Sequence, residues 1–132
     1  MINEGEIVVI RTDNGETLMG EFLGQNDVAL VMLHVIRIDL GTTEGYPSMS
    51  PTLAFPFFRD AKMMVRFDKV QCLEKPSDFY VQYYDLAWSE LTELEAQRQD
   101  KLLSFIEKKV EAEVVKNAGL ASYVAGDPSN LQ

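Results

Sequence analysis

The chain has 132 residues, of which 46% are hydrophobic, so it is long enough for one globular domain with its own core and an appendage. Its formal net charge of −9 at pH 7 argues against a general affinity for nucleic acid, because phosphate binding relies on clustered Lys and Arg. Residues 1–75 carry a net charge of −4 and residues 76–132 a net charge of −5, so any nucleic-acid site has to be local.

The first predicted element is a β-hairpin in EIVVIRTDNGETLMGEFLG, residues 6–24. Asp13-Asn14-Gly15 is a turn sequence between two apolar runs, and Gly15 supplies the positive φ that such a turn needs. Gly20 lies inside the returning strand, where a glycine costs roughly 0.5–1 kcal/mol. We therefore expect Gly20 to mark a sharp bend, which lets one long strand serve both halves of a small curved sheet.

Residues 28–38 are rich in β-branched and apolar side chains, which predicts a strand buried on much of both faces. The next segment, residues 39–60, contains two glycines and three prolines, which argues against regular structure over most of its length. Its aromatic group, Phe55, Phe57 and Phe58, is expected to cover the core, and the alternative is an exposed binding surface. A second hairpin is predicted over residues 61–67 and 70–74.

A helical region follows Pro76. Ser77 is an expected N-cap, and no Pro or Gly occurs before Gly119, so residues 77–117 are predicted to be helical. The polar stretch at residues 95–101 interrupts the apolar face. The part of the helix beyond it is expected to project or fold back, because an unbroken helix of this length would be longer than a small β domain is wide. The expected buried face consists of apolar residues at helical spacing: Phe79, Tyr83, Leu86, Ala87, Leu91 and Leu94.

Two single residues could suggest reactive chemistry. Cys72 has no second cysteine to pair with and lies in a strand-like run, so we expect a buried apolar side chain, and a reactive thiol is the weaker alternative. His34 has no Cys, Asp or Glu at metal-ligand spacing, which favours a strand residue over a metal ligand. No nucleophile with a base, no metal set and no phosphate-binding glycine loop is recognisable. We therefore expect neither an enzyme nor a bound cofactor or metal.

The predicted organisation is a mostly β protein with a C-terminal helical extension. Residues 1–75 are expected to form a five-stranded, strongly bent antiparallel sheet, a small open barrel, in which residues 39–60 are a variable loop. Residues 76–117 form the helical extension, and residues 118–132 are expected to be a flexible tail. The chain has no apolar run near the roughly 18 residues of a membrane span, and MINEGEIVV lacks signal-peptide features, so we expect a cytoplasmic protein that does not bind membranes.

Two residue patterns occur in order between residues 6 and 75. The first comprises Val8, Ile10, Gly15, Gly20, Phe22, Val31 and Leu33, with Asn26 in the turn, and the second is Val65-Arg66-Phe67-Asp68-Lys69-Val70 with Leu73. They resemble the two motifs of the Sm-like (LSm) family, small bent-sheet barrels that form rings and often bind RNA. The first motif is matched without gaps, with Asn26 at the position of the usual aspartate, and the second is matched except that Phe67 replaces a glycine. The usual N-terminal helix of the family has no room here, and short bacteriophage members are the nearest comparison, which would imply the host cytoplasm.

The resemblance implies where RNA would bind. The stacking position of the family corresponds to Val28 and its base-reading asparagine to Leu30, and neither side chain can do that work. Arg66 matches the family's arginine. Asn26 and Phe67 are further candidates, for an amide contact and a stacking surface. The alternative for Arg66 is a structural role in its turn.

The resemblance also implies self-assembly, because the last two strands of an open barrel have unpaired backbone groups. A head-to-tail contact between these strands is expected to close a ring of about five to seven copies. Two functions follow: a ring that binds single-stranded RNA, or a structural adaptor ring that binds protein partners through its helices. The interface residues expected from these two strands are Met63, Met64, Val65, Val70, Cys72 and Leu73.

Overall fold

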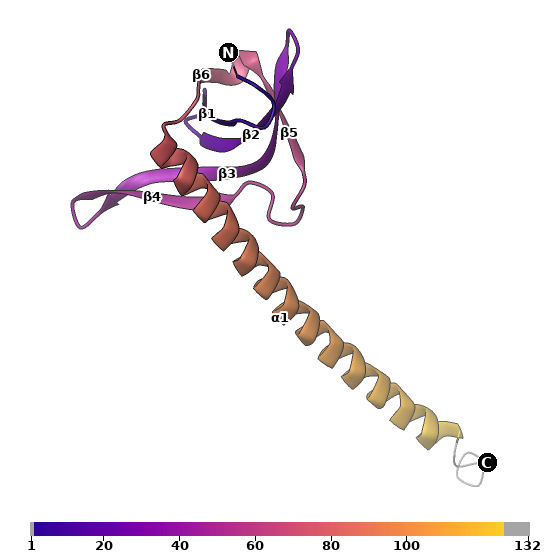
Figure 1. Ribbon diagram of the computed structural model, residues 1–132. Coiled ribbons are helices and arrows are strands. Elements are labelled where there is room, and N and C mark those ends of the chain that lie inside the picture. Colours follow the sequence, from indigo (N-terminus) through magenta and orange to yellow (C-terminus); the bar gives the residue numbers. More distant parts are fainter. Residues whose placement is uncertain (1, 126–132) are drawn as a thin grey trace. The chain divides into compact units, whose positions relative to one another are not determined.

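The computed structural model describes residues 2–125 and shows the expected class of fold, an open antiparallel sheet with one C-terminal helix (Figure 1). The chain divides into two compact units, Met1–Glu95 and Ala96–Gln132. The elements in chain order are β1 (Ile7–Thr12), β2 (Thr17–Gln25), β3 (Ala29–Thr43), β4 (Tyr46–Leu53), β5 (Lys62–Arg66), a 3-10 turn (Phe67–Lys69), β6 (Val70–Glu74) and α1 (Asp78–Ala125).

The sheet is organised around the long strand β3. Its strand order is β4-β3-β2-β1-β6, and β5 pairs with the first part of β3. The predicted second hairpin was therefore wrong: among the described residues β5 and β6 do not pair with each other, because the 3-10 turn between them leads the chain from β3 to β1 at the other end of the bent sheet. Residues 29–33 of β3 pair with β5, whereas residues 36–43 pair with β4, so the strand changes partner on one side near its middle. Because both halves of β3 share β2 as the neighbour on the other side, the sheet bends between them and encloses a core.

Gly20 is required at this bend. Met19 pairs with Ile36 and Glu21 pairs with Leu33, so Gly20 of β2 faces two residues of β3, which is a β-bulge. A Cβ atom on Gly20 would lie 3.0 Å from the carbonyl oxygen of Leu33 and 3.1 Å from Cγ2 of Val35. His34, in the bulge, has a φ of 54°, in the left-handed region. The expectation that Gly20 marks the bend is confirmed, and its cause is the close approach of β3.

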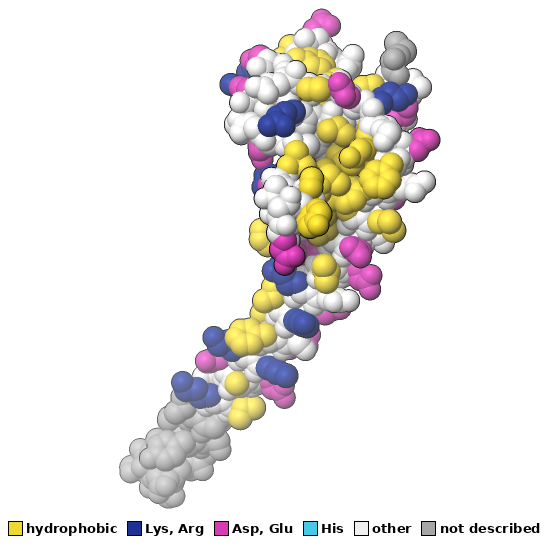
Figure 2. All heavy atoms as spheres, turned by 90° about the vertical axis from the view of Figure 1, so that its left-hand side faces the viewer, with side chains coloured by type: hydrophobic (Ala, Val, Ile, Leu, Met, Phe, Trp, Pro, Cys, Tyr) yellow, Lys and Arg dark blue, Asp and Glu magenta, His cyan; other side chains and the backbone are white. Residues whose placement is uncertain are grey.

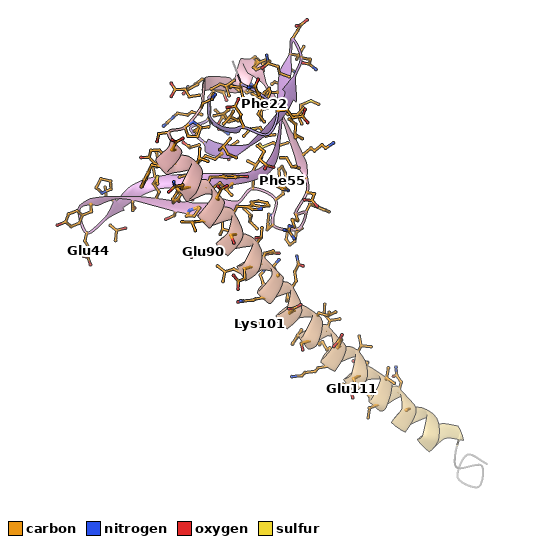
Figure 3. The ribbon with its side chains drawn as sticks, viewed as in Figure 1. Phe22, Glu44, Phe55, Glu90, Lys101 and Glu111 are labelled. Carbon is orange, nitrogen blue, oxygen red and sulfur yellow. The ribbon has the colours of Figure 1, made fainter. Side chains whose placement is uncertain are left out.

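Two hydrophobic clusters lie on opposite faces of the sheet. The inner cluster fills the inside of the bend, where Phe22 points inward (Figure 3), and the outer cluster lies under the first turns of α1. The bulge places Val35 in the inner cluster and the next residue, Ile36, in the outer one. The buried members of the inner cluster are Val8, Ile10, Leu18, Phe22, Leu30, Met32, Val35 and Val65, and those of the outer cluster are Met19, Ile36, Ile38, Tyr84 and Ala87.

The prediction of irregular structure for residues 39–60 was wrong over its first part. Strand β3 continues to Thr43 and returns as β4, which adds a sixth strand to the expected five. The two-residue connection has positive φ at Glu44 and Gly45, which suits a tight hairpin, and Figure 3 shows Glu44 at its tip. Pro47 and Pro51 are tolerated because β4 is an edge strand, where a missing N–H interrupts no ladder.

The segment after β4, residues 54–61, does lack regular structure. Ala54 packs against the inner cluster, but Phe57 and Phe58 are exposed, so the expectation that the aromatic group covers the core was wrong for these two residues. Phe55 is half-buried.

Helix α1 follows the prediction in its start and in part of its buried face. It begins at Asp78, directly after Ser77, whose carbonyl oxygen accepts hydrogen bonds from the backbone N–H groups of Tyr80 and Val81. Three predicted members of that face contact the outer cluster: Ala87 is buried, and Tyr83 and Leu91 are partly buried. The predicted members Phe79, Leu86 and Leu94 are exposed, and the buried Tyr84 was not predicted. Periodicity alone identified the face only in part, because apolar residues occur on more than one side of this helix.

The helix continues without a break through the polar stretch at residues 95–101 and extends to Ala125. The expected tail from residue 118 is therefore helical as far as Ala125, which corrects that prediction, and residues 126–132 lie outside the described part of the chain.

Candidate nucleic-acid interface

The turn between β2 and β3 lies beside the end of β5. Ala29 pairs with Arg66, and the backbone N–H of Phe67 donates a hydrogen bond of 2.8 Å to the carbonyl oxygen of Val28. The same turn contains Asn26, whose backbone N–H donates to the carbonyl oxygen of Ala29 at 2.9 Å. The structure therefore brings Asn26 near Arg66 and Phe67, which follow it by 40 residues or more in the sequence, and all three were predicted as site residues.

Asn26 already has a structural task. Its Oδ1 atom accepts hydrogen bonds of 2.8 Å from the backbone N–H groups of both Val28 and Ala29, which closes an Asx-type turn. The carbonyl end of the side chain is thus occupied. A ligand could be recognised only by the amide nitrogen.

Arg66 is the cation at this position, and its side chain is 65% exposed. Its Nη2 atom lies 3.1 Å from Oδ2 of Asp68, so a neighbouring carboxylate offsets part of its charge. Such an exposed pair contributes little to stability, roughly 0–1 kcal/mol, and leaves other guanidinium N–H donors for a ligand. Arg66 could therefore contact one phosphate or one base edge.

The stacking surface that RNA binding needs is poorly provided. Phe67 is half-buried and packs against the inner cluster, so its ring is not a free platform. Val28 is exposed but has no π face, and Leu30 is 0% exposed inside the core. Neither carried-over position therefore offers a side chain that could stack on a base or read its edge.

A groove of about 320 Å³ lies beside the turn. Its lining includes one basic residue, Lys62, and two residues with side-chain amides, Gln25 and Asn26. This set could hold one polar or anionic group. The remaining lining residues are Leu23, Gly24, Ala29, Val31 and Met64.

The two strands predicted to carry the subunit interface are β5 and β6. Among the described residues, β5 pairs with β3 alone and β6 pairs with β1 alone, so each strand has one side without a partner strand. Met64, on β5, is 69% exposed. The other predicted interface residues of β5 serve the core: Val65 is buried, and Met63 is half-buried against the inner cluster.

The predicted interface residues of β6 also differ in how far they are buried. Val70 and Leu73 pack partly against the inner cluster, whereas Cys72 is exposed, so the prediction that Cys72 is buried was wrong. Its side chain lies on the outward face of an edge strand. Partial desolvation and the carboxylate of Glu74 raise the pKa of the Cys72 thiol, which makes it a poor nucleophile near neutral pH.

One polar cluster was missed entirely by the sequence interpretation. His34 bridges two carboxylates, with Nδ1 at 2.8 Å from Glu21 and Nε2 at 2.9 Å from Asp60, and its ring lies 4.7 Å from that of Trp88. Because each carboxylate uses a different ring nitrogen, the three groups do not converge on one point. Within residues 2–125 no group of three or more His, Cys, Asp or Glu could hold a metal ion. The cluster ties β2, β3, the segment after β4 and α1 together.

No protein-family model matches the chain, and no curated protein matches it. Among the described residues, no helix combines the length and the apolar character needed to cross a membrane.

Proposed function

We propose that the protein is an Sm-like subunit of a homo-oligomeric ring and that the ring binds single-stranded RNA. The observation that carries the proposal is the pair of open edges on β5 and β6, at the two ends of a strongly bent sheet. Neither strand contains a proline, whereas the outer edge of β4 contains Pro47 and Pro51. Of the three edges in the described sheet, only β4 is thus protected against strand pairing by proline.

The two open edges explain why a ring is preferred to a dimer. Edge β5 of one copy pairs with edge β6 of the next, which is a heterologous contact, and repetition closes a ring of about five to seven copies. Such pairing satisfies backbone groups that a monomer leaves to water. It also covers Met64 and Cys72, the two exposed apolar side chains at these edges.

The ring compensates for a weak site by repetition. Each subunit contributes Arg66, Lys62 and the amide of Asn26, too little for tight binding of an isolated site in a protein of net charge −9. Sites repeated around a ring bind one flexible strand with a high effective concentration, so weak contacts add to useful avidity. Single-stranded RNA is the strand that the family resemblance implies.

Assembly is tested by light scattering on the purified chain. We expect a mass of about five to seven times the 14.9 kDa chain. Met64→Lys combined with Cys72→Lys should reduce the mass to that of one chain, because lysines on a strand edge oppose pairing. Leu40→Lys, at an equally exposed position on β3 away from both edges, is the control and should assemble normally. A monomeric wild-type chain at micromolar concentration would contradict the ring.

RNA binding is tested by fluorescence anisotropy with short U-rich and A-rich RNAs at several salt concentrations. We expect Arg66→Ala to weaken binding about tenfold and to reduce the slope of log affinity against log salt by about one. Arg59→Ala, at an exposed arginine in the segment after β4, should change neither quantity. A wild-type ring without salt-dependent, base-selective signal would reject RNA as the ligand and leave assembly intact.

A second candidate function is a structural adaptor ring that binds a protein partner and no RNA. The pairing of Arg66 with Asp68 and the packing of Phe67 into the core both favour it. The acidic charge of the chain favours it as well. Under this function, light scattering would still give the mass of the ring, and fluorescence anisotropy would show no RNA binding.

A further inference from the structure

The second unit contains an apolar stripe on α1. Leu102, Ile106, Val110 and Val114 follow one another at intervals of four residues, so they share one side of the helix. Their exposed fractions range from 44% to 59%. Figure 2 shows apolar side chains at the surface along this part of the chain. We call these four residues the helix stripe.

The stripe is hollowed in a way that can accept side chains from another helix. A groove of about 370 Å³ lies along it, lined by Ile106, Lys109, Val110, Glu113, Val114 and Asn117. Helices that pack side by side insert apolar side chains into such spaces between the residues of the facing helix. Glu113 and Asn117 are polar members of the groove, of the kind that fix register in helix assemblies.

An exposed stripe of this kind is costly for an isolated helix. Helical stability in proteins comes mostly from packing of an apolar face, and helices without such packing are marginal in water. Four large aliphatic side chains in about four turns also make a contiguous apolar surface, which soluble proteins normally cover. The stripe therefore requires an occupant.

The charges identify that occupant. Residues 1–95 carry seven basic and sixteen acidic side chains, which is the whole net charge of −9, whereas residues 96–118 carry five basic and four acidic ones. Around the helix most of the charges separate: Lys109 and Lys116 lie along one flank of the stripe, and Asp100, Glu107 and Glu111 lie along the other. Glu113 is the exception, since it lies in the groove on the side of the two lysines. Lys109 lies 5.7 Å from the ring centroid of Phe105, on its own flank.

Segregated flanks make this segment complementary to itself in one orientation. When copies pack in parallel around a rotation axis, the basic flank of one meets the acidic flank of the next. An antiparallel pair related by a two-fold axis would instead place like flanks together, which is repulsive. The flank charges therefore favour a parallel arrangement of sister helices.

We propose that residues 102–117 of α1 pack in parallel against the same residues of neighbouring copies, through the helix stripe. This inference rests on the proposed ring, because rotation about a ring axis gives the helix of every copy the same direction along that axis, which is compatible with parallel packing and not with antiparallel packing. It adds to the ring a second contact, made by a different part of the chain.

The test uses disulfide formation in the full-length chain with Cys72→Ser as background. Ile106→Cys and Val114→Cys each place one cysteine on the stripe, and both should form disulfide-linked dimers on mild oxidation. In a parallel bundle every stripe residue lies near its own equivalent, whereas an antiparallel pair could link only one of these two positions to itself. Ser104→Cys, on the other side of the helix, is a nearly isosteric control and should remain largely unlinked.

The outcomes separate this inference from the ring itself. Linkage at both stripe positions, but not at residue 104, supports parallel packing. Linkage at only one stripe position, or equally at residue 104, overturns it. A full-sized ring that links at no stripe position also overturns it and leaves the proposed function standing. A monomeric wild-type chain would reject the ring. If neither stripe variant then formed a disulfide-linked dimer, parallel packing of the helices would be rejected as well.

Charge reversal provides a second readout. Lys109→Glu with Lys116→Glu makes both flanks acidic and should lower the yield of the Val114→Cys disulfide at least severalfold. Adding Glu107→Lys and Glu111→Lys exchanges the flanks and should restore the yield. An unchanged yield in the first variant would show that flank complementarity does not orient the helices.

Discussion

Replacing Gly20 by alanine is expected to lower the free energy of unfolding by about 1–3 kcal/mol, because the added methyl group overpacks the bend. Its Cβ would lie 3.0 Å from a backbone oxygen of Leu33 and 3.1 Å from a methyl group of Val35. The backbone atom cannot rotate away as a long side chain could. Relief requires a shift of β3 at the bulge, which supports both halves of the sheet.

Urea unfolding followed by circular dichroism measures this effect, and Gly24→Ala is the matched control. Gly24 lies in the same strand, also without positive φ, and no atom lies within 4 Å of the position that its added methyl group would take. The control should stay within about 0.5 kcal/mol of the wild type. If Gly20→Ala were equally harmless, the close approach of β3 would not be what requires glycine at the bend.

Truncating Tyr84 to alanine is expected to lower the free energy of unfolding by about 3–5 kcal/mol. Tyr84 is only 3% exposed, belongs to the outer cluster, and its hydroxyl donates a hydrogen bond to the carbonyl oxygen of His34 in the bulge. Burial, with the carboxylates of Glu21 and Asp85, raises the pKa of the Tyr84 hydroxyl, so it keeps its proton and donates. One side chain thus holds α1 on the sheet and supports the strained residue of β3.

Tyr84→Phe separates the two contributions. It keeps the ring in the outer cluster and removes the hydrogen bond, so it should cost about 1 kcal/mol. Leu94→Ala, at an exposed position of the same helix, is the control and should cost no more than about 0.5 kcal/mol. Thermal and urea unfolding would both report these differences. Equal effects of Tyr84→Ala and Leu94→Ala would mean that α1 contributes little to the cover of the sheet.

Local signals predicted much of the β domain. The Asp13-Asn14-Gly15 turn, the glycine inside the returning strand and the helix start after Ser77 each have a short-range physical cause. The β3–β4 hairpin was missed because prolines are usually strand breakers, and only the position of β4 at an edge makes Pro47 and Pro51 acceptable. Edge position is a property of the assembled sheet.

The candidate site was predictable in location but not in detail. The resemblance to the two motifs suggested Asn26 and Arg66 as members of one site. The strand pairing places the turn that contains Asn26 beside Arg66. The occupation of the Asn26 carbonyl by its own turn, and the pairing of Arg66 with Asp68, depend on side-chain positions that no spacing rule predicts. The His34 cluster joins residues 13 and 26 positions apart from His34, so it has no local signature either.

In the proposed ring, the prolines of β4 also limit how copies can connect. With that edge blocked, each copy would have a valence of two, one connection through β5 and one through β6. Units of valence two cannot branch into networks; they can only grow end to end until the last copy meets the first. A small proportion of copies with one disabled connection should therefore act as chain terminators and leave open arcs in place of closed particles.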